Sequence, residues 1–204
     1  MPETKSATRE KILAAAEAVF HENGFKGART TQIAERSGVS RTMMHYYFRT
    51  KEELFQEVLK NTFGFFLEHA QSLFVEHRDL KTLIDNLVDL FHKVLSEKPG
   101  LPSFLVNIIN ENPALIINLP VAQTEILPAL FDQLLAKARE DGSIQSHISG
   151  ENLVLNLYGM MVMPYLGAPF IQYKEGRSSE DMQDFLRARK ETIKSFLWNG
   201  LQLA

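Results

Sequence analysis

Cysteine is absent from the 204-residue chain, which excludes disulfide bonds and thiolate metal sites. No segment shows the alternating apolar and polar pattern of a β-strand. The N-terminus lacks the apolar run of a signal peptide. The motifs G-x-S-x-G, H-E-x-x-H, G-x-G-x-x-G and the P-loop are also missing. These absences favour an all-α protein of the cytoplasm that is not an enzyme, with no metal site and no cofactor.

Basic residues are concentrated in one stretch of an acidic chain. Residues 25–51 hold six basic residues against one acidic residue, a local net charge of +5, whereas the whole chain carries −3. A basic island on an acidic protein is typical of one small surface that meets phosphate. The alternative interpretation is an ordinary solvated charged face.

The same stretch contains a helix-turn-helix pattern. Residues 31–48 predict two short helices around the turn Ser37-Gly38-Val39, since glycine adopts the left-handed conformation that ends a helix. We expect Thr31 to cap the first helix and Ser40 the second. In a helix-turn-helix unit the second helix enters the major groove of DNA.

Apolar residues recur at helical spacing in most of the chain. We expect about nine helices, including a first helix near 8–23, a long fourth helix at 51–77, and later helices at 80–95, 103–110, 120–140, 150–166 and 178–201. Residues 1–50 should form a three-helix DNA-binding domain. Residues 51–204 should form a larger helical domain for ligand binding and dimerisation, with the fourth helix linking the two.

The segment VSRTMMHYYFRTKEEL, residues 39–54, resembles the signature of TetR-family bacterial transcriptional regulators. The Asn-Gly-Phe end of the first helix and the Thr-Thr-x-x-Ile-Ala run also match, so the resemblance covers about residues 8–59. It implies a dimer that binds a palindromic operator and responds to a small molecule. Two residues depart from the commonest pattern, Thr42 and His45, and both lie on the groove-facing helix.

The resemblance also implies which side chains meet DNA. Arg41 is the side chain at the leading edge of the recognition helix that can pair bidentately with guanine, and Met43 can contact a thymine methyl group. We expect His45 to donate to a phosphate; the alternative is that it packs against the first helix. Met44 and Phe48 should face the core. The full expected set is Thr31, Ser40, Arg41, Thr42, Met43, His45, Tyr46, Tyr47 and Lys51.

Residues 153–171 are apolar on nearly all sides, which is unusual for a surface helix of a monomer. A membrane span is one interpretation, because the length is suitable. Asn156, Gly159, Pro164, Gly167 and Pro169 interrupt the run, however. We therefore favour a homodimer, with the helices at 150–166 and 178–201 forming the interface as the resemblance implies.

The middle helices should enclose an effector pocket, again by resemblance. The aromatic and soft side chains there suit an apolar or aromatic effector that releases a repressor from its operator, although each of them can equally be plain core. The alternative functions are a ligand-binding or assembly protein that does not bind specific DNA and, less favoured, an enzyme. The expected lining residues are Phe63, Phe66, Phe91, Phe104, Asn107, Asn110, Tyr158, Met161 and Tyr165.

Overall fold

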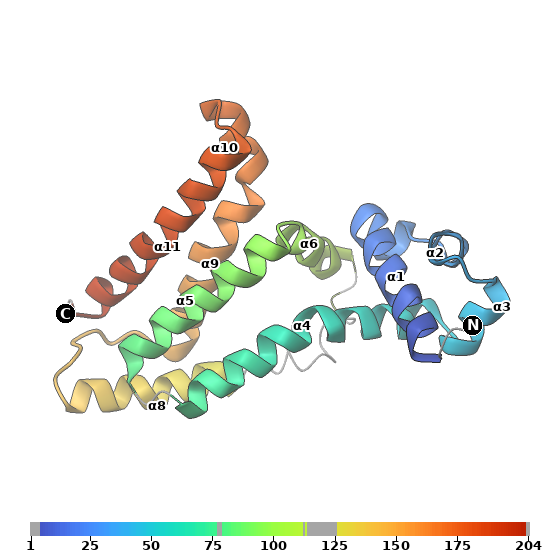
Figure 1. Ribbon diagram of the computed structural model, residues 1–204. Coiled ribbons are helices and arrows are strands. Elements are labelled where there is room, and N and C mark those ends of the chain that lie inside the picture. Colours follow the sequence, from blue (N-terminus) through green and yellow to red (C-terminus); the bar gives the residue numbers. More distant parts are fainter. Residues whose placement is uncertain (1–4, 77–78, 112, 114–125, 203–204) are drawn as a thin grey trace. The chain divides into compact units, whose positions relative to one another are not determined.

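The computed structural model describes residues 5–76, 79–111, 113 and 126–202 (Figure 1). Every regular element in these ranges is a helix, and no strand occurs among them, so the expected all-α fold is confirmed. The ten described helices are α1 (Lys5–Gly27), α2 (Thr30–Ser37), α3 (Arg41–Tyr47), α4 (Lys51–Glu76), α5 (Leu80–Glu97), α6 (Leu101–Glu111), α8 (Ile126–Glu140), α9 (Gly150–Leu166), α10 (Ala168–Glu175) and α11 (Ser179–Gln202).

Helix boundaries follow the local signals closely. α1 is interrupted at Gly24, which has a φ of +66°, and α5 begins where Asp79 accepts a 2.8 Å hydrogen bond from the Thr82 N–H. The helices expected at 150–166 and 178–201 correspond to α9 and α11. The apolar run beyond residue 166 contains a separate helix, α10, which the sequence did not predict. The start expected at residue 120 lies outside the described residues.

The described residues form two compact units. Unit 1 combines residues 5–65 with the segment from Ser103 onward, and unit 2 combines 66–102 with 126–202. α4 and α6 therefore each contribute residues to both units. The division expected from the sequence, with one domain at residues 1–50 and another at 51–204, remains a prediction.

Unit 1 has an aromatic core. The rings of Phe25 and Phe55 lie with their centroids 4.8 Å apart, and Phe20 lies 4.8 Å from Phe55 in an edge-to-face arrangement. Phe104 of α6 extends this cluster, since its ring lies 5.9 Å from that of Phe55. Burying each such side chain contributes about 1.5–3 kcal/mol. The cluster fixes the start of α4 against the end of α1, and α2 and α3 are held on the same unit.

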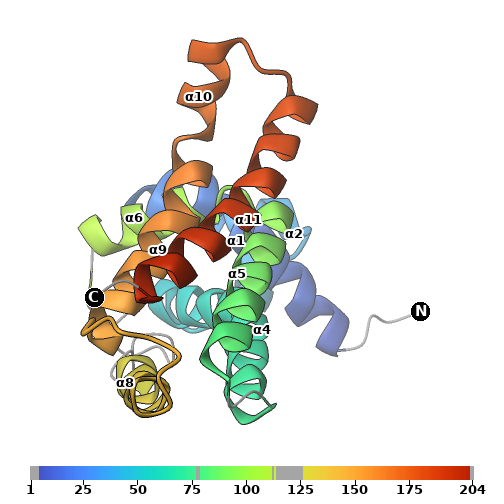
Figure 2. The ribbon, with the colours of Figure 1, turned by 90° about the vertical axis from the view of Figure 1, so that its left-hand side faces the viewer.

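Unit 2 is built from the second part of α4 together with α5, α8, α9, α10 and α11. α9 packs on both α5 and α8, and α11 packs on α5. The connection between α8 and α9 is held on α8, because Arg139 donates to the carbonyls of Ser146 and Ile148 at 2.8 and 2.7 Å. α10 lies at the end of α9 that is remote from α8 (Figure 2).

Candidate nucleic-acid interface

The turn between α2 and α3 has the geometry expected for a helix-turn-helix. Gly38 adopts the left-handed conformation with a φ of +70°, and its N–H donates to Glu35 O at 3.2 Å. Val39 N–H donates to Ala34 O at 3.1 Å. These bonds satisfy carbonyls at the end of α2 and reverse the chain. A side chain at position 38 would strain this backbone, so glycine is required here.

One face of α3 anchors it to the core of unit 1. Ser40 caps the helix, since its hydroxyl accepts from Met43 N–H at 3.1 Å. Met44 is 1% exposed and Phe48 is 3% exposed, as expected from their spacing of four residues. This anchoring leaves the opposite face of α3 for solvent.

The solvent face of α3 carries most of the side chains expected to meet DNA. Met43 and Tyr46 are 46% and 67% exposed. The Tyr46 ring packs edge-to-face on Tyr47, which is half-buried, with a centroid distance of 5.4 Å. Arg41, Thr42 and His45 are also exposed, so His45 does not take the alternative place packed against α1.

Thr31 does not cap α2, contrary to expectation. α2 begins at Thr30, and Thr31 is its second residue. The amide of Gln32 accepts from the backbone N–H of Arg29 at 3.1 Å and closes the start of the helix instead. A Gln side chain three residues after the cap position reaches back to the free N–H there. The half-buried Thr31 lies in the first turn of α2, where backbone N–H groups have no partner within the helix.

Lys51 is turned toward its own unit. Its ammonium donates to the carbonyls of Phe25 and Ala28 at 2.9 and 3.2 Å and lies 4.5 Å from the centre of the Phe25 ring. The ammonium has three donors, so one remains for a phosphate. Lys51 therefore holds the connection between α1 and α2 in place, a role that its position in the sequence did not reveal.

We expect Lys51→Met to lower the free energy of unfolding by about 1–2 kcal/mol, because two charge-assisted hydrogen bonds and a cation–π contact are lost. Thermal unfolding followed by circular dichroism measures the effect. The control is Lys60→Met, since Lys60 makes an exposed pair with Glu57 on the same helix and such pairs contribute little. Equal melting temperatures for the two variants would contradict the assigned role of Lys51.

The charged side chains near α3 differ in their pairing. Arg36 on α2 pairs with Glu22, with both carboxylate oxygens within 2.8 Å of Nη1. Arg41 and Arg49 flank the exposed face of α3 and are themselves exposed. Phosphate contacts position a protein on DNA, whereas base contacts give specificity. Arg41 lies in the first turn of α3, and its contact with a base remains a prediction.

The residues expected to line an effector pocket are distributed over both units. In unit 2, Phe91 lies between Phe66 and Tyr158, with ring centroids at 4.7 and 5.3 Å. These three line an almost wholly apolar cavity of about 20 Å³, which has room for about one water molecule. Burial raises the pKa of Tyr158. Met161 is buried in unit 2 but does not line this cavity.

The remaining expected lining residues lie elsewhere. Phe63 and Phe104 are buried in unit 1, where Phe104 stacks on His21 at 4.2 Å. Asn107 and Asn110 are exposed on α6. Tyr165 lines a second, larger pocket of about 500 Å³ in unit 2 that sequence reasoning missed. The pocket is lined by residues from the end of α5, from α9 and α10, and from α11, so no local sequence pattern could predict it.

The described residues can be checked for helices that could span a membrane and for side chains that could bind a metal. None of them is by itself long and apolar enough to cross a membrane, but the pair α9 and α10, bent by 53°, meets that standard of length and composition together. No group of three or more His, Asp or Glu side chains that could hold a metal occurs among the described residues.

Comparison with known proteins agrees with this geometry. Residues 12–58 match the family model described as bacterial regulatory proteins, tetR family. The transcriptional regulator RutR of Escherichia coli K12 is 45% identical over 62 residues, which are 30% of this chain and 29% of RutR. The chain thus matches less than a third of that relative's length. The transcriptional regulator UidR of the same strain is 28% identical over 164 residues, or 76% of this chain and 80% of UidR.

The fold has solved counterparts as well. The crystal structure of FadR from Bacillus subtilis in complex with stearoyl-CoA has a TM-score of 0.63 and 20% sequence identity, over 94% of this chain and 98% of that chain. An anchored recognition helix behind a glycine turn defines a helix-turn-helix protein. Residues 12–58 carry the DNA-binding domain of the TetR family of bacterial regulators, and the relatives named above, RutR and UidR, are transcriptional regulators.

Proposed function

We propose that the protein is a dimeric transcriptional repressor that binds a palindromic operator and is released by a small effector. The observation that carries the proposal is the exposed face of α3 with Arg41, Met43 and Tyr46, on a helix anchored by buried Met44 and Phe48. Thr31, Ser40, Thr42, His45, Tyr47 and Lys51 complete the proposed DNA contacts. Such a regulator acts in the bacterial cytoplasm, where its operator lies.

A homodimer is proposed because one recognition helix reads few base pairs and two-fold dimers read paired half-sites. Leu155 and Met163 on α9 and Phe196 on α11 are 60%, 58% and 64% exposed. Large apolar side chains that remain exposed on neighbouring helices mark an interaction surface. We therefore propose α9 and α11 as the dimer interface.

An apolar or aromatic effector is proposed because Phe66, Phe91 and Tyr158 line an almost wholly apolar cavity, which has to widen from its present volume of about 20 Å³ to admit an effector. FadR, which shares the fold, was crystallised with stearoyl-CoA. An effector lowers operator affinity only if it binds the released conformation more tightly. Stearoyl-CoA is the first probe: if it leaves the affinity for a selected operator unchanged, acyl-CoA is the wrong class.

Selection of binding sites from random duplex DNA tests the proposal. We expect a palindrome with half-sites about one helical turn, roughly 34–36 Å, apart or a multiple of that distance. Binding should also weaken steeply as salt rises, since phosphate contacts release counterions. A chain that selects no sequence would instead support the alternative, a ligand-binding or assembly protein of this fold.

Arg41→Ala should relax the sequence preference at one base pair of each half-site, with a loss of about 1–3 kcal/mol of discrimination. Fluorescence anisotropy with the selected operator and its single-base variants measures this. Arg36→Ala is the matched control, because it also removes one positive charge, but Arg36 lies on α2 and pairs with Glu22. If both variants keep the full preference, Arg41 does not read a base.

A further inference from the structure

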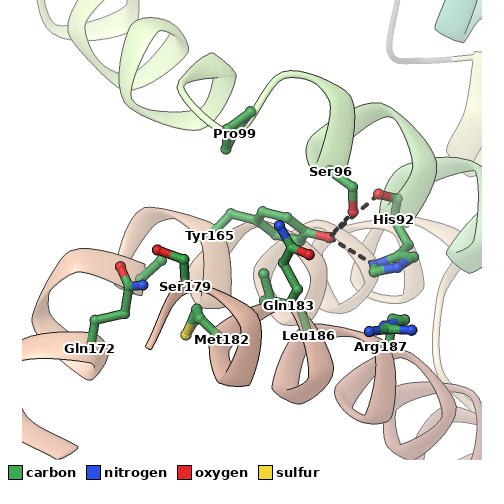
Figure 3. Close-up of a pocket in the computed structure, with 11 residues that line it drawn as sticks. His92, Ser96, Pro99, Tyr165, Gln172, Ser179, Met182, Gln183, Leu186 and Arg187 are labelled. Carbon is green, nitrogen blue, oxygen red and sulfur yellow. Dashed lines mark hydrogen bonds between the residues drawn. The ribbon is translucent and has the colours of Figure 1, made fainter. Parts of the chain in front are cut away.

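The larger pocket of unit 2 exists because the chain bends after α9. Pro164 removes a backbone hydrogen bond in the last turn of α9, and α10 then departs at 53°. Gly176, with a φ of +64°, turns the chain back into α11. The space left between the end of α5, the α9–α10 bend and the first turns of α11 measures about 500 Å³ (Figure 3). Ligand pockets are typically of about 300–1,000 Å³.

One end of the pocket is a hydrogen-bonding cluster. The Tyr165 hydroxyl lies 2.7 Å from His92 Nδ1 and 3.0 Å from Ser96 Oγ (Figure 3). Tyr165 is only 6% exposed, so its ring forms part of the wall and its position is fixed. Burial, and then the nearby Lys190 ammonium, hold the pKa of His92 below its ordinary value of 6.5. His92 is therefore neutral at physiological pH and can serve as donor or acceptor.

The charge of the lining has one sign. Arg187 lines the pocket on the same side as His92 (Figure 3), and no carboxylate is found among the described lining residues. Arg187 pairs with Asp184, one turn away on an exposed part of α11, but a guanidinium has five N–H donors and this pair leaves others.

The carboxylate of Asp89 on the neighbouring helix α5 is already paired with basic side chains. Asp89 of α5 is engaged by Lys190 and Lys194 of α11 at 2.8 and 2.9 Å. These two ammonium groups therefore offset its charge close to His92. An anion entering the pocket would thus meet Arg187, and the charge of Asp89 on α5 is already offset.

The rest of the lining combines apolar side chains with three polar ones, Gln172, Ser179 and Gln183. The apolar part consists of Met182, which is 4% exposed, with Leu186 and Pro99 (Figure 3). Ala168 also lines the pocket. A ligand that fills this region needs an apolar body next to its polar group. A lining that combines apolar side chains with a small number of polar groups is the usual pattern of a small-molecule site.

We propose that this pocket binds a small carboxylic acid, with its carboxylate toward Arg187 and Ser96 and its apolar body against Met182 and Leu186. The site is separate from the apolar cavity at Phe91, and the two share no lining residue. It therefore adds a second kind of ligand to the function proposed above. Binding is measured on the protein alone, so the result does not depend on operator recognition.

The test uses the methyl group of Met182 as a reporter. The protein is labelled with ¹³C at its methionine methyl groups, the Met182 signal is assigned with Met182→Leu, and 2-naphthoate is titrated at pH 7. We expect a saturable shift of the Met182 signal, with no saturable change at Met43, which lies in unit 1. The neutral isostere 2-naphthamide should bind at least about tenfold more weakly, since charge-assisted hydrogen bonds are the stronger ones.

Two variants identify the charge that matters. Arg187→Gln should weaken 2-naphthoate binding at least about tenfold, whereas Arg189→Gln, which removes the same charge from α11 outside the pocket, should leave it unchanged. Circular dichroism establishes that both variants are folded. The proposal is overturned if Met182 does not respond, if acid and amide bind equally, or if both Arg variants behave alike. It is also overturned if the Met182 signal follows protein concentration instead of ligand, because a second copy would then cover the pocket.

Discussion

Replacing Gly150 by alanine is expected to destabilise the protein by at least about 3 kcal/mol, because the new methyl group has no space. A Cβ at this position would lie 2.0 Å from Pro128 O and 3.0 Å from Asp132 N. Both are backbone atoms of α8, so no side chain can rotate away. The Gly150 N–H also donates to Asp132 Oδ1 at 2.6 Å, and that bond would break as α9 moved away.

Thermal unfolding should show the effect as a decrease in melting temperature of roughly 6–12 °C for a chain of this size. Gly64→Ala is the matched control, since Gly64 is also helical and no neighbouring heavy atom lies within 4 Å of the place that its new methyl group would take. The free energy of unfolding of that variant should rise by about 0.5–1 kcal/mol, because alanine has a higher helix propensity than glycine. If Gly150→Ala has the same melting temperature as the wild type, α8 and α9 do not approach each other as closely as described.

Phe196→Glu is expected to dissociate the proposed dimer and to weaken operator binding at least about 100-fold. A carboxylate in the proposed apolar interface would lose its hydration without gaining a partner, and a monomer would lose the effective concentration that joins two half-sites. Analytical ultracentrifugation reports the oligomeric state, and anisotropy titration with the selected operator reports affinity.

Tyr173→Glu is the control for this experiment. Tyr173 is 90% exposed on α10, outside the proposed interface of α9 and α11, so this variant should remain dimeric and bind the operator. A dimer that survives Phe196→Glu but not Tyr173→Glu would place the interface on α10 instead. Two dimeric variants with full affinity would contradict the proposed interface altogether.

The features that the sequence predicted are those that depend on neighbouring residues. Gly38 and Ser40 act within one turn of their own helices, and the buried pair Met44 and Phe48 follows from helical periodicity. The family resemblance added roles for exposed residues such as Arg41. These roles remain predictions, because exposure permits a DNA contact but does not demonstrate one.

The features that the sequence did not predict depend on distant residues. Lys51 binds carbonyls 26 and 23 residues away, and the Tyr165 hydroxyl meets a histidine 73 residues away. Gly150 was expected as the start of a helix, but a start signal does not say how closely another helix approaches. The effector lining remains a prediction, since aromatic residues at helical spacing occur in plain core as well as in pockets.

The way unit 1 is assembled limits how this protein can be recombined with others. Glu111 at the end of α6 accepts from the backbone N–H of Lys26 at 3.3 Å, so the last turn of α1 is held by a residue 85 positions later. Phe104 likewise completes the aromatic cluster of Phe55. A hybrid sensor made by joining residues 1–50 to a foreign effector domain would leave both behind. A transplantable module has to carry α6 and the first half of α4 along with the first three helices.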